Sequence, residues 1–373
     1  MQKKWISLGL MSGTSGDGVD ASIISSNGVD FYESIKNKFF EYDTRIYKDI
    51  HTLKEKIHKI EHLTTFKKEI ENLERKITIF HAQIIKQLNL SDNTIIGFHG
   101  QTIYHNPKEK ISKQLGDGKL LSQLVKKNVI YKFRQNDINN GGEGAPLTPI
   151  FHQLIATQLK LDLPVCFLNI GGISNITIVN KPVGTFEFTS RDIGPGNCLI
   201  DNWIRKNSEK KYDKNGLLAA KGICNKIILE QAQELFANRS DQKFLSLDVN
   251  DFDVSFVRGL SLEDGSSTLT ELTAMIISSI LSTIVKNNKN SNFQILVSGG
   301  GRKNSYMMKR IRDNSSNKLN IKSIDDHGID GDFVESQAFA FLAIRSFLNL
   351  PISFPQTTGC EISSTGGELI KFE

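Results

Sequence analysis

The chain has 373 residues, of which 39% are hydrophobic and 23% are charged, and this composition argues against disordered, collagen-like and disulfide-scaffold proteins. A net charge of +5 is too small over this length to predict a nucleic-acid or membrane partner. The start of the chain does not resemble a signal peptide, and no stretch approaches the roughly 18 apolar residues of a membrane span. We therefore expect a cytoplasmic protein whose four widely spaced cysteines are reduced.

The first half of the chain begins with a pattern of strands. Residues 5–10 and 19–25 are predicted to form two strands joined by a glycine turn, and residues 29–35 a third. Apolar residues then recur every three or four positions from 44 to 90, which predicts a helical insertion of two packed helices with a break near Leu63. Strands are predicted at 94–98 and 128–133, and a helix after Pro149.

The second half repeats the opening pattern. A strand at 165–169, a turn at Gly171-Gly172 and a strand at 175–179 are followed by a strand at 185–190, which delivers Asp192 onto a glycine-proline turn. A core helix is predicted at 271–286, and a strand at 293–297 runs into three glycines. The repeated pattern predicts a duplicated α/β architecture with a cleft between its halves.

The glycine turn between the first two strands is the first candidate for ligand binding. Neither a Walker A motif nor a G-x-G-x-x-G motif occurs in the chain, so the common nucleotide signatures are absent. The segment 12–18 nevertheless combines backbone donors, hydroxyl groups and the carboxylate of Asp17, which suits phosphate and a bound cation. The alternative is a long polar hairpin turn without a ligand. Asp192 likewise is either catalytic or an acceptor for the N–H groups of its own turn.

Several long motifs, in a fixed order, carry a resemblance to a known family. The chain contains GLMSGTSGDGVDASI, GFHGQTIYH, QLGDGKLL, FRQNDINNGGEGAPLTPIFH, NIGGISNIT, DIGPGNCLID, VSGGGRKN and DFVESQAFAFLA. Together they span nearly the whole chain and resemble the anhydro-N-acetylmuramic acid kinases. The resemblance implies an α/β fold of duplicated actin-like ATPase (ribonuclease H-like) domains, each a mixed five-stranded sheet with helices, and an active site in the interdomain cleft. The expected domains are 1–128 plus 356–373, with the insertion 44–90, and 129–355.

The family's reaction couples hydrolysis to phosphorylation. Water opens the 1,6-anhydro bridge of 1,6-anhydro-N-acetylmuramic acid at the anomeric carbon, and the freed 6-oxygen takes the γ-phosphate of ATP. The products are N-acetylmuramic acid 6-phosphate and ADP, formed in peptidoglycan recycling. By this resemblance Asp192 is the base that accepts the proton of the water.

The resemblance also assigns binding residues, with ATP and Mg²⁺ as the implied cofactors. The residues assigned to ATP are Gly13, Thr14, Ser15, Gly16, Asp17, Gly18, Val19, Asp20, Gly299, Gly300, Gly301 and Asn304. Arg134 and Glu335 are the residues assigned to the sugar, although each is equally able to form a structural ion pair. No metal ligands are assigned. Gly16 stands where the family usually has a larger apolar residue, which puts the affinity for ATP in question.

Two other functions remain open at this point. A conventional sugar kinase of the same superfamily would use its aspartate to deprotonate a hydroxyl group of the sugar. An actin-like or chaperone ATPase would hydrolyse ATP without acceleration by a sugar. The expected partners are the anhydro-sugar and ATP, and a homodimer is compatible with the sequence, which does not determine the oligomeric state.

Overall fold

The chain forms two compact units, and the computed structural model describes residues 3–237, 247, 252–288, 292–315 and 319–372. The first unit comprises Met1–Lys160, Lys181–Thr189 and Asp332–Glu373, and the second comprises Leu161–Asn180 and Ser190–Gly331. These units do not coincide with the expected domains 1–128 plus 356–373 and 129–355. Residues 129–160 and 332–355 belong to the first unit, since residues 129–131 pair with its sheet and residues 334–347 pack on it.

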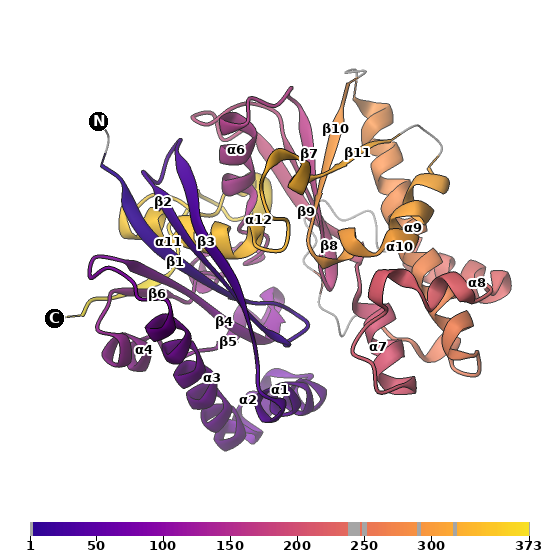
Figure 1. The fold of residues 1–373 in the computed structure, drawn as a ribbon, viewed down its shortest axis with the longest axis horizontal. Helices are drawn as coiled ribbons and strands as arrows, with labels where there is room; N and C mark the ends of the chain where they lie inside the picture. The colour runs from indigo at the N-terminus through magenta and orange to yellow at the C-terminus, as the bar shows by residue number, and fades with distance from the viewer. Residues whose placement is uncertain (1–2, 238–246, 248–251, 289–291, 316–318, 373) are drawn as a thin grey trace. The chain divides into compact units, whose positions relative to one another are not determined.

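The first unit is built on a mixed sheet with the strand order β12-β6-β4-β1-β2-β3, and β5 also pairs with β4 (Figure 1). β1 is antiparallel to β2 and parallel to β4. The elements of this unit are β1 (Trp5–Ser12), β2 (Gly18–Ser26), β3 (Tyr32–Glu41), α1 (Thr44–Lys56), α2 (Ile60–Thr65), α3 (Lys67–Gln87), β4 (Ile95–Asn106), β5 (Ile111–Leu115), α4 (Gly118–Val125), β6 (Val129–Tyr131), α5 (Gln135–Asn139), α6 (Pro149–Gln158), α11 (Val334–Phe347), α12 (Pro355–Thr358) and β12 (Glu368–Ile370).

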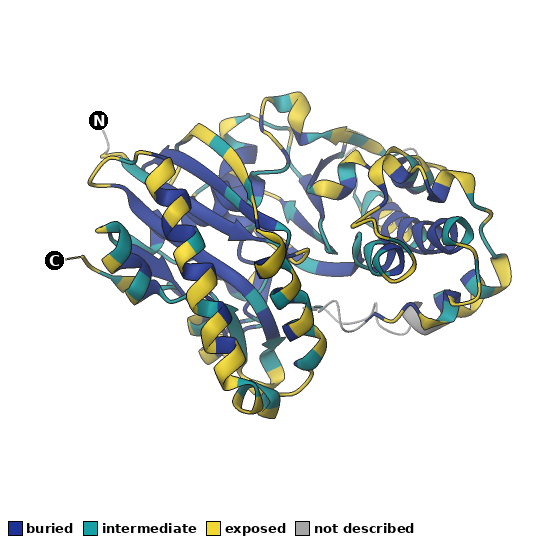
Figure 2. Ribbon diagram, turned by 60° about the horizontal axis from the view of Figure 1, so that its bottom comes forward, coloured by how far each residue is buried: buried dark blue, intermediate teal, exposed yellow. Residues whose placement is uncertain are grey.

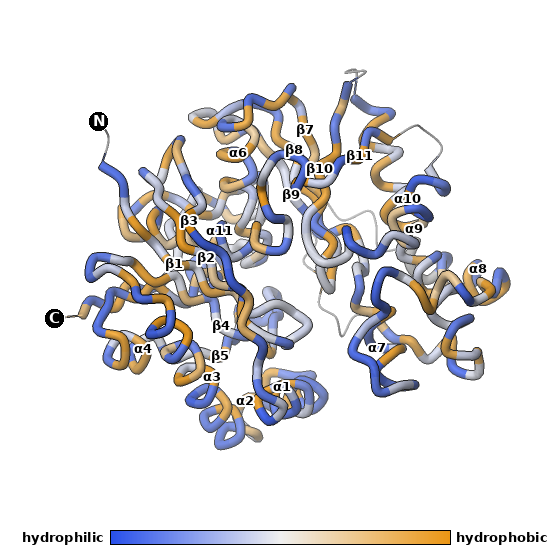
Figure 3. Tube along the Cα trace, viewed as in Figure 1, coloured by the Kyte–Doolittle hydropathy of each residue, from blue (hydrophilic) through white to orange (hydrophobic). Residues whose placement is uncertain are grey.

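The two faces of this sheet are covered by different helices. Leu8 and Leu10 of β1 are fully buried in a core that they share with residues of α1 and α3, such as Ile50. Because side chains alternate along a strand, Gly9 lies on the opposite face, where a Cβ atom would collide with the carbonyl oxygen of Ser336 in α11. Helix α3, for example, buries the hydrophobic residues on one of its sides and exposes the hydrophilic residues on the other (Figures 2 and 3).

The second unit has a five-stranded mixed sheet with the order β11-β10-β7-β8-β9. β7 is antiparallel to β8 and parallel to β10. The elements of this unit are β7 (Val165–Ile170), β8 (Ile173–Val179), β9 (Phe188–Pro195), α7 (Cys198–Asn207), α8 (Lys226–Ala237), α9 (Leu262–Asn287), β10 (Gln294–Ser298), α10 (Ser305–Asp313) and β11 (Asn320–Ser323).

The two sheets share one topology, which confirms the predicted α/β class of duplicated domains. The order β3-β2-β1-β4-β6 in the first sheet corresponds to β9-β8-β7-β10-β11 in the second. In each sheet the first strand in sequence is antiparallel to the second and parallel to the fourth. The first sheet exceeds the predicted five strands because β12 and the hairpin strand β5 extend it.

Helix α9 is the core helix that the sequence predicts, and it begins at Leu262 rather than at residue 271. Its start is capped by Ser261, whose hydroxyl oxygen accepts a hydrogen bond of 3.0 Å from the N–H of Asp264. By length and composition α9 is apolar enough to cross a membrane, but 61% of its most apolar window is buried inside the structure. Leu269, Leu272 and Ile277 are fully buried in the core of the second unit, as in the central helix of a folded domain. The four cysteines are free thiols, as expected.

Several predicted boundaries are wrong for identifiable reasons. β3 starts at Tyr32 rather than at residue 29, because the side-chain oxygen of Asn27 accepts hydrogen bonds from the N–H groups of residues 29–31 and holds them in a turn. The insertion 44–90 contains three helices, since the chain leaves the helical conformation at Ile57 as well as at Phe66. β4 continues to Asn106 because β5 pairs with its second half.

Candidate active site

The glycine loop between β1 and β2 has an exposed tip and a buried end. Thr14 and Ser15 are exposed, whereas Gly16 is buried with a φ of +63° and donates its N–H to the oxygen of Gly13 at 3.1 Å. This left-handed conformation suits glycine, which has no Cβ atom, and would strain an apolar side chain at the same position. Apart from its chain neighbours, the described atom nearest to a Cβ on Gly13 would be the hydroxyl of Ser15, at 4.0 Å, so the backbone there is open to a ligand.

Buried side chains of the first unit brace this loop. The amide of Gln101, fully buried in β4, donates to the oxygen of Gly13 at 3.0 Å and lies 2.6 Å from the hydroxyl of Ser12. The Tyr42 hydroxyl donates to the Ser12 oxygen at 3.0 Å, and burial raises the pKa of Tyr42, so the hydroxyl keeps its proton. Gln101 belongs to the motif GFHGQTIYH, yet sequence reasoning assigned it no role. The sequence signal was a polar residue three positions after the predicted apolar strand 94–98.

The carboxylates expected near a cation lie at the end of the loop and in β2. The hydroxyl of Ser15 donates to Asp17 at 2.6 Å, and Asp20 is half-buried in β2 opposite Met11. Gly18 and Val19, between them, are buried. Among the residues described, no three His, Cys, Asp or Glu side chains gather as a metal site. One or two carboxylates beside a phosphate loop are what Mg²⁺ requires, since it takes its other ligands from phosphates and water.

Asp192 lies in the second unit, within β9 rather than on the turn where the sequence placed it. The strand continues to Pro195, and Asp192 is 7% exposed. Its Oδ2 atom accepts a hydrogen bond of 2.8 Å from the N–H of Leu247. An aspartate inside a strand is aimed more rigidly than one on a turn, because the sheet defines its backbone.

The turn after Asp192 packs against the Gly171-Gly172 turn. The N–H of Gly196 donates to the oxygen of Gly172 at 2.9 Å, and the N–H of Asn197 donates to the oxygen of Gly171 at 2.8 Å. A Cβ atom on Gly196 would collide with that same Gly171 oxygen. The motifs NIGG and GPGN therefore form one rigid corner, a pairing that sequence reasoning did not anticipate.

The three glycines after β10 differ in their surroundings. Gly299 has a φ of +81°, and a Cβ atom there would meet the side chain of Asn169 in β7. A Cβ atom on Gly301 would collide with Ile170, whereas one on Gly300 would meet no described atom within 4 Å outside its chain neighbours. Gly299 and Gly301 are thus required for packing on β7, and Gly300 is the position open to a ligand.

Asn304 has a structural role in addition to any contact with a nucleotide. It is 7% exposed, and its side-chain oxygen accepts a hydrogen bond of 3.0 Å from the N–H of Met307, which caps α10. Before it, the Arg302 guanidinium forms hydrogen bonds of 2.6 and 2.9 Å with Asp325 and one of 3.0 Å with the oxygen of Gly299. The glycine turn is therefore fixed on both sides.

Arg134 lies in the first unit and is positioned by His99. Its Nε and Nη2 atoms lie 3.2 and 3.1 Å from Nε2 of His99, and its Nη1 atom donates to the oxygen of Gly144 at 2.8 Å. The other ring nitrogen of His99 lies 2.8 Å from the oxygen of Gly100, so it carries the proton and Nε2 is the acceptor. Burial and the positive charge of Arg134 lower the pKa of His99 to about 3, which keeps the ring neutral.

Glu335 lies in the first turn of α11, close enough to Arg134 for their charges to interact. Burial raises the pKa of Glu335, and the positive charge of Arg134 opposes this shift. The structure thus brings together the two residues assigned to the sugar, and adds His99, which sequence reasoning did not select. Its only sequence signal was a histidine within the motif GFHGQT.

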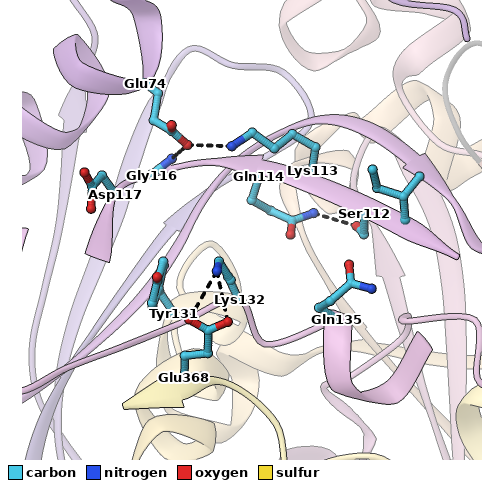
Figure 4. Close-up of a pocket in the computed structure, with 11 residues that line it drawn as sticks. Glu74, Ser112, Lys113, Gln114, Gly116, Asp117, Tyr131, Lys132, Gln135 and Glu368 are labelled. Atoms are coloured by element: carbon cyan, nitrogen blue, oxygen red, sulfur yellow. Dashed lines mark hydrogen bonds and ion pairs between the residues drawn. The ribbon is translucent and has the colours of Figure 1, made fainter. Parts of the chain in front are cut away.

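A pocket of about 390 Å³ on the first unit lies apart from these residues (Figure 4). Two ion pairs form between residues that line it, Lys113 with Glu74 at 2.8 Å and Lys132 with Glu368 at 2.9 Å. None of the described residues that line it is a predicted site residue. The predicted residues instead form two groups in the first unit, the glycine loop and the Arg134 cluster, and two in the second, Asp192 with its corner and the triple-glycine turn.

Comparison with known proteins identifies the family. The family model described as anhydro-N-acetylmuramic acid kinase matches residues 5–371. An anhydro-N-acetylmuramic acid kinase of Pelagibacter ubique (strain HTCC1062) is 53% identical over 100% of both chains, and one of Zymomonas mobilis is 36% identical over 98% of this chain and 99% of that protein. Among solved structures, the activator of the 2-hydroxyisocaproyl-CoA dehydratase from Clostridium difficile, with bound ADPNP, is similar at a TM-score of 0.41 and 11% identity, over 91% of this chain and 94% of that one. The chain therefore belongs to the anhydro-N-acetylmuramic acid kinase family.

Proposed function

We propose that this kinase opens the 1,6-anhydro bridge of its sugar with water and phosphorylates the freed oxygen, giving N-acetylmuramic acid 6-phosphate and ADP. Membership of the family makes the chain an ATP-dependent phosphotransferase with an alcohol group as acceptor. The ring opening and the residues that perform it are the proposal. The observation that carries it is the buried carboxylate of Asp192, held by β9 two residues before the rigid corner at Gly194 and Gly196.

In the proposed reaction, Asp192 accepts a proton from the attacking water. The water oxygen forms a bond to the anomeric carbon, the bond from that carbon to the 6-oxygen breaks, and its electron pair stays on the 6-oxygen. The 6-oxygen then attacks the γ-phosphorus, and the bond to the β-phosphate oxygen breaks with its electrons on ADP. Asp192 finally returns its proton to solvent. Positioning and charge neutralisation carry most of such a phosphoryl transfer.

Loop 13–18 is proposed to bind the phosphates of ATP. The open backbone at Gly13 and the exposed hydroxyl groups of Thr14 and Ser15 support this assignment. Asp17 and Asp20 are the residues that would hold Mg²⁺, which neutralises charge on the transferred phosphoryl group. The turn Gly299-Gly300-Gly301 and Asn304 are proposed to bind the adenosine end. The support for them is the open position at Gly300, together with the neighbours that fix the turn.

Arg134 and Glu335 are proposed to bind the sugar. The guanidinium of Arg134 suits the lactyl carboxylate, because a planar fork of N–H donors matches the two oxygens of a carboxylate. His99 and the oxygen of Gly144 hold the guanidinium in one orientation, and the N–H of Gly144 in turn donates to Asp137 at 2.7 Å. Glu335, beside Arg134, is proposed to accept hydrogen bonds from ring hydroxyls or from the water.

A cytoplasmic location, small molecules as the partners and a homodimer complete the proposal. The net charge of +5 and the burial of α9 support the first two. Analytical ultracentrifugation of the purified protein tests the homodimer, and a sedimentation coefficient for one chain of this length would exclude it.

Isotope labelling tests the ring opening. The enzyme is incubated with ATP, Mg²⁺ and the anhydro-sugar in ¹⁸O-water, and the label should enter the anomeric hydroxyl of the product in amounts matching ADP formation. Unlabelled product kept in ¹⁸O-water for the same time gives the spontaneous exchange to subtract. Phosphorylation of the hydrolysed sugar but not of the anhydro-sugar would instead identify a conventional sugar kinase.

A further inference from the structure

Helix α1 presents one face to the glycine loop between β1 and β2. Tyr47, Ile50, His51 and Lys54 recur at the spacing of a single helical face. Two side chains of this face lie close to Gly16, since a Cβ atom there would be 3.0 Å from Ile50 Cγ2 and 3.8 Å from His51 Nε2, with Gln101 Oε1 of β4 between them at 3.6 Å. Because residue 16 is glycine and has no side chain, α1 lies directly against the loop.

The close approach of α1 places a lysine at the tip of the loop. The Nζ atom of Lys54 donates a hydrogen bond of 2.9 Å to the oxygen of Thr14. Thr14 and Ser15, on either side of the adjoining peptide, are exposed, so the ammonium group lies at the exposed tip of the loop. An ammonium group has three N–H donors, so it can bind a carbonyl oxygen and a phosphate oxygen at the same time.

We propose that Lys54 is an additional phosphate-binding residue, supplied by the helical insertion to the triphosphate on loop 13–18. The proposal rests on the function proposed above for that loop. A triphosphate concentrates negative charge on its oxygens, and a charge-assisted hydrogen bond from an ammonium group is among the stronger polar contacts in proteins. The same side chain fixes the carbonyl of Thr14, so it both orients the loop and neutralises its ligand.

Substitution of Lys54 by methionine tests the proposal, because methionine keeps most of the length of the side chain and removes the charge. The Lys54→Met enzyme should bind a non-hydrolysable ATP analogue about tenfold more weakly, as expected for a lost hydrogen bond to a charged group. Its affinity for adenosine, measured by competition, and its KM for the anhydro-sugar should stay within about twofold. Lys54→Arg should restore most of the affinity for the analogue, and rising salt should reduce the difference between wild type and Lys54→Met.

Lys48→Met is the matched control, since Lys48 is an exposed lysine on another face of α1. It should leave the affinity for the analogue unchanged. Equal affinity of Lys54→Met and wild type for the analogue would overturn the proposal, and so would an equal loss for adenosine and the analogue, which would indicate a disturbed fold. Gly13→Val distinguishes the role of Lys54 from the assignment of loop 13–18 to the phosphates. If Gly13→Val weakens binding of the analogue and Lys54→Met does not, only the role of Lys54 is wrong. If Gly13→Val binds the analogue normally, the assignment of the loop is wrong as well.

Discussion

The guanidinium of Arg302 donates two hydrogen bonds to the carboxylate of Asp325, one of 2.6 Å from Nε and one of 2.9 Å from Nη2. The same guanidinium donates to the oxygen of Gly299, and Asp325 accepts the N–H of Gly331 at 3.1 Å. One ion pair thus joins the triple-glycine turn to the segment that follows β11. The Arg302 side chain is 7% exposed and that of Asp325 43%, so solvent weakens the pair without abolishing it.

Replacement of Arg302 by alanine should loosen this turn. We expect the free energy of unfolding in urea to fall by about 1–2 kcal/mol, because the hydrogen bonds to a charged group are lost, and the KM for ATP to rise. Hydrogen bonding by Arg302 holds the pKa of Asp325 well below its usual range, so the contribution of the pair is present at neutral pH and disappears as the pH falls below about 4 toward the lowered pKa. Arg312→Ala, an exposed arginine on α10, is the control. Equal stability of the two variants would contradict the role of the ion pair.

Asp192→Asn should separate chemistry from nucleotide binding. Asparagine keeps the size of the side chain and still accepts the N–H of Leu247, but it does not accept a proton from water. Turnover should fall by about 10² to 10⁴-fold, with the affinity for an ATP analogue nearly unchanged. Asp92→Asn, at a fully exposed aspartate, should behave as wild type. Substantial turnover by Asp192→Asn would rule out Asp192 as the base.

Gly13→Val should yield a folded protein that binds ATP poorly. Among the described residues beyond Ser12 and Thr14, a new Cβ would meet the Ser15 hydroxyl oxygen at 4.0 Å and no closer atom, so the melting temperature should change little. The affinity for ATP should drop at least about tenfold, because a β-branched side chain would occupy the space of the phosphates. Calorimetric titration measures this, and normal binding would show that the loop is not the phosphate site.

The triple-glycine turn offers a similar contrast between adjacent positions. A Cβ atom at Gly300 has no neighbour within 4 Å in the part of the chain that the structure describes, its chain neighbours aside, whereas one at Gly301 collides with Ile170. Gly300→Val should therefore keep its stability and lose affinity for adenosine and ATP alike, and Gly301→Val should lose stability first. Thermal melts with and without adenosine distinguish the two results. Unchanged adenosine binding by Gly300→Val would remove the turn from the adenosine site.

Buried histidines should make the free energy of unfolding decrease in mild acid. Burial lowers the pKa of His81 to about 4, and that of His99, His105 and His152 to about 3. The unfolded chain takes up protons below its ordinary histidine pKa of about 6.5 while the folded chain does not, so stability is complete above that pH and is lost as the pH falls. Each histidine contributes a slope of up to about 1.4 kcal/mol per pH unit.

Urea unfolding between pH 4.5 and pH 7.5 measures this sensitivity. His152→Gln, at a residue that is 2% exposed, should reduce the loss of stability between pH 7 and pH 5 by about 2 kcal/mol. His58→Gln, at an exposed residue, should leave the slope as in wild type. If His152→Gln also leaves the slope unchanged, His152 titrates normally in the folded protein.

The sequence predicts strands and turns more accurately than it predicts the surroundings of side chains. Alternation and glycine placement locate β1, β2, β7 and β8 to within a few residues, because these signals are local. The position of Asp192 inside β9 depends on how far the neighbouring strand continues, which is not a local property. The part that His99 plays beside Arg134 depends on two segments 35 residues apart meeting in the folded chain.

The domain boundaries depend on contacts that are even more distant in the sequence. Helix α11 packs on β1 and β4 where Gly9 and Gly97 permit close approach, and no pattern within α11 reveals that partner. Its apolar residues indicate only that it is buried. The strand β12, which pairs with β6, is three residues long, too short to produce a periodic signal.

The return of the chain to its first sheet has a consequence for its synthesis. β1 and β2 leave the ribosome early, but the helix that covers them, α11, and the strand that borders β6 lie in residues 334–370. During translation the face of the first sheet that α11 covers therefore stays uncovered until residues 334–347 have been made, whereas the second unit, which ends at Gly331, has by then been synthesised. The nascent amino-terminal segment is thus the part of this protein most in need of a chaperone.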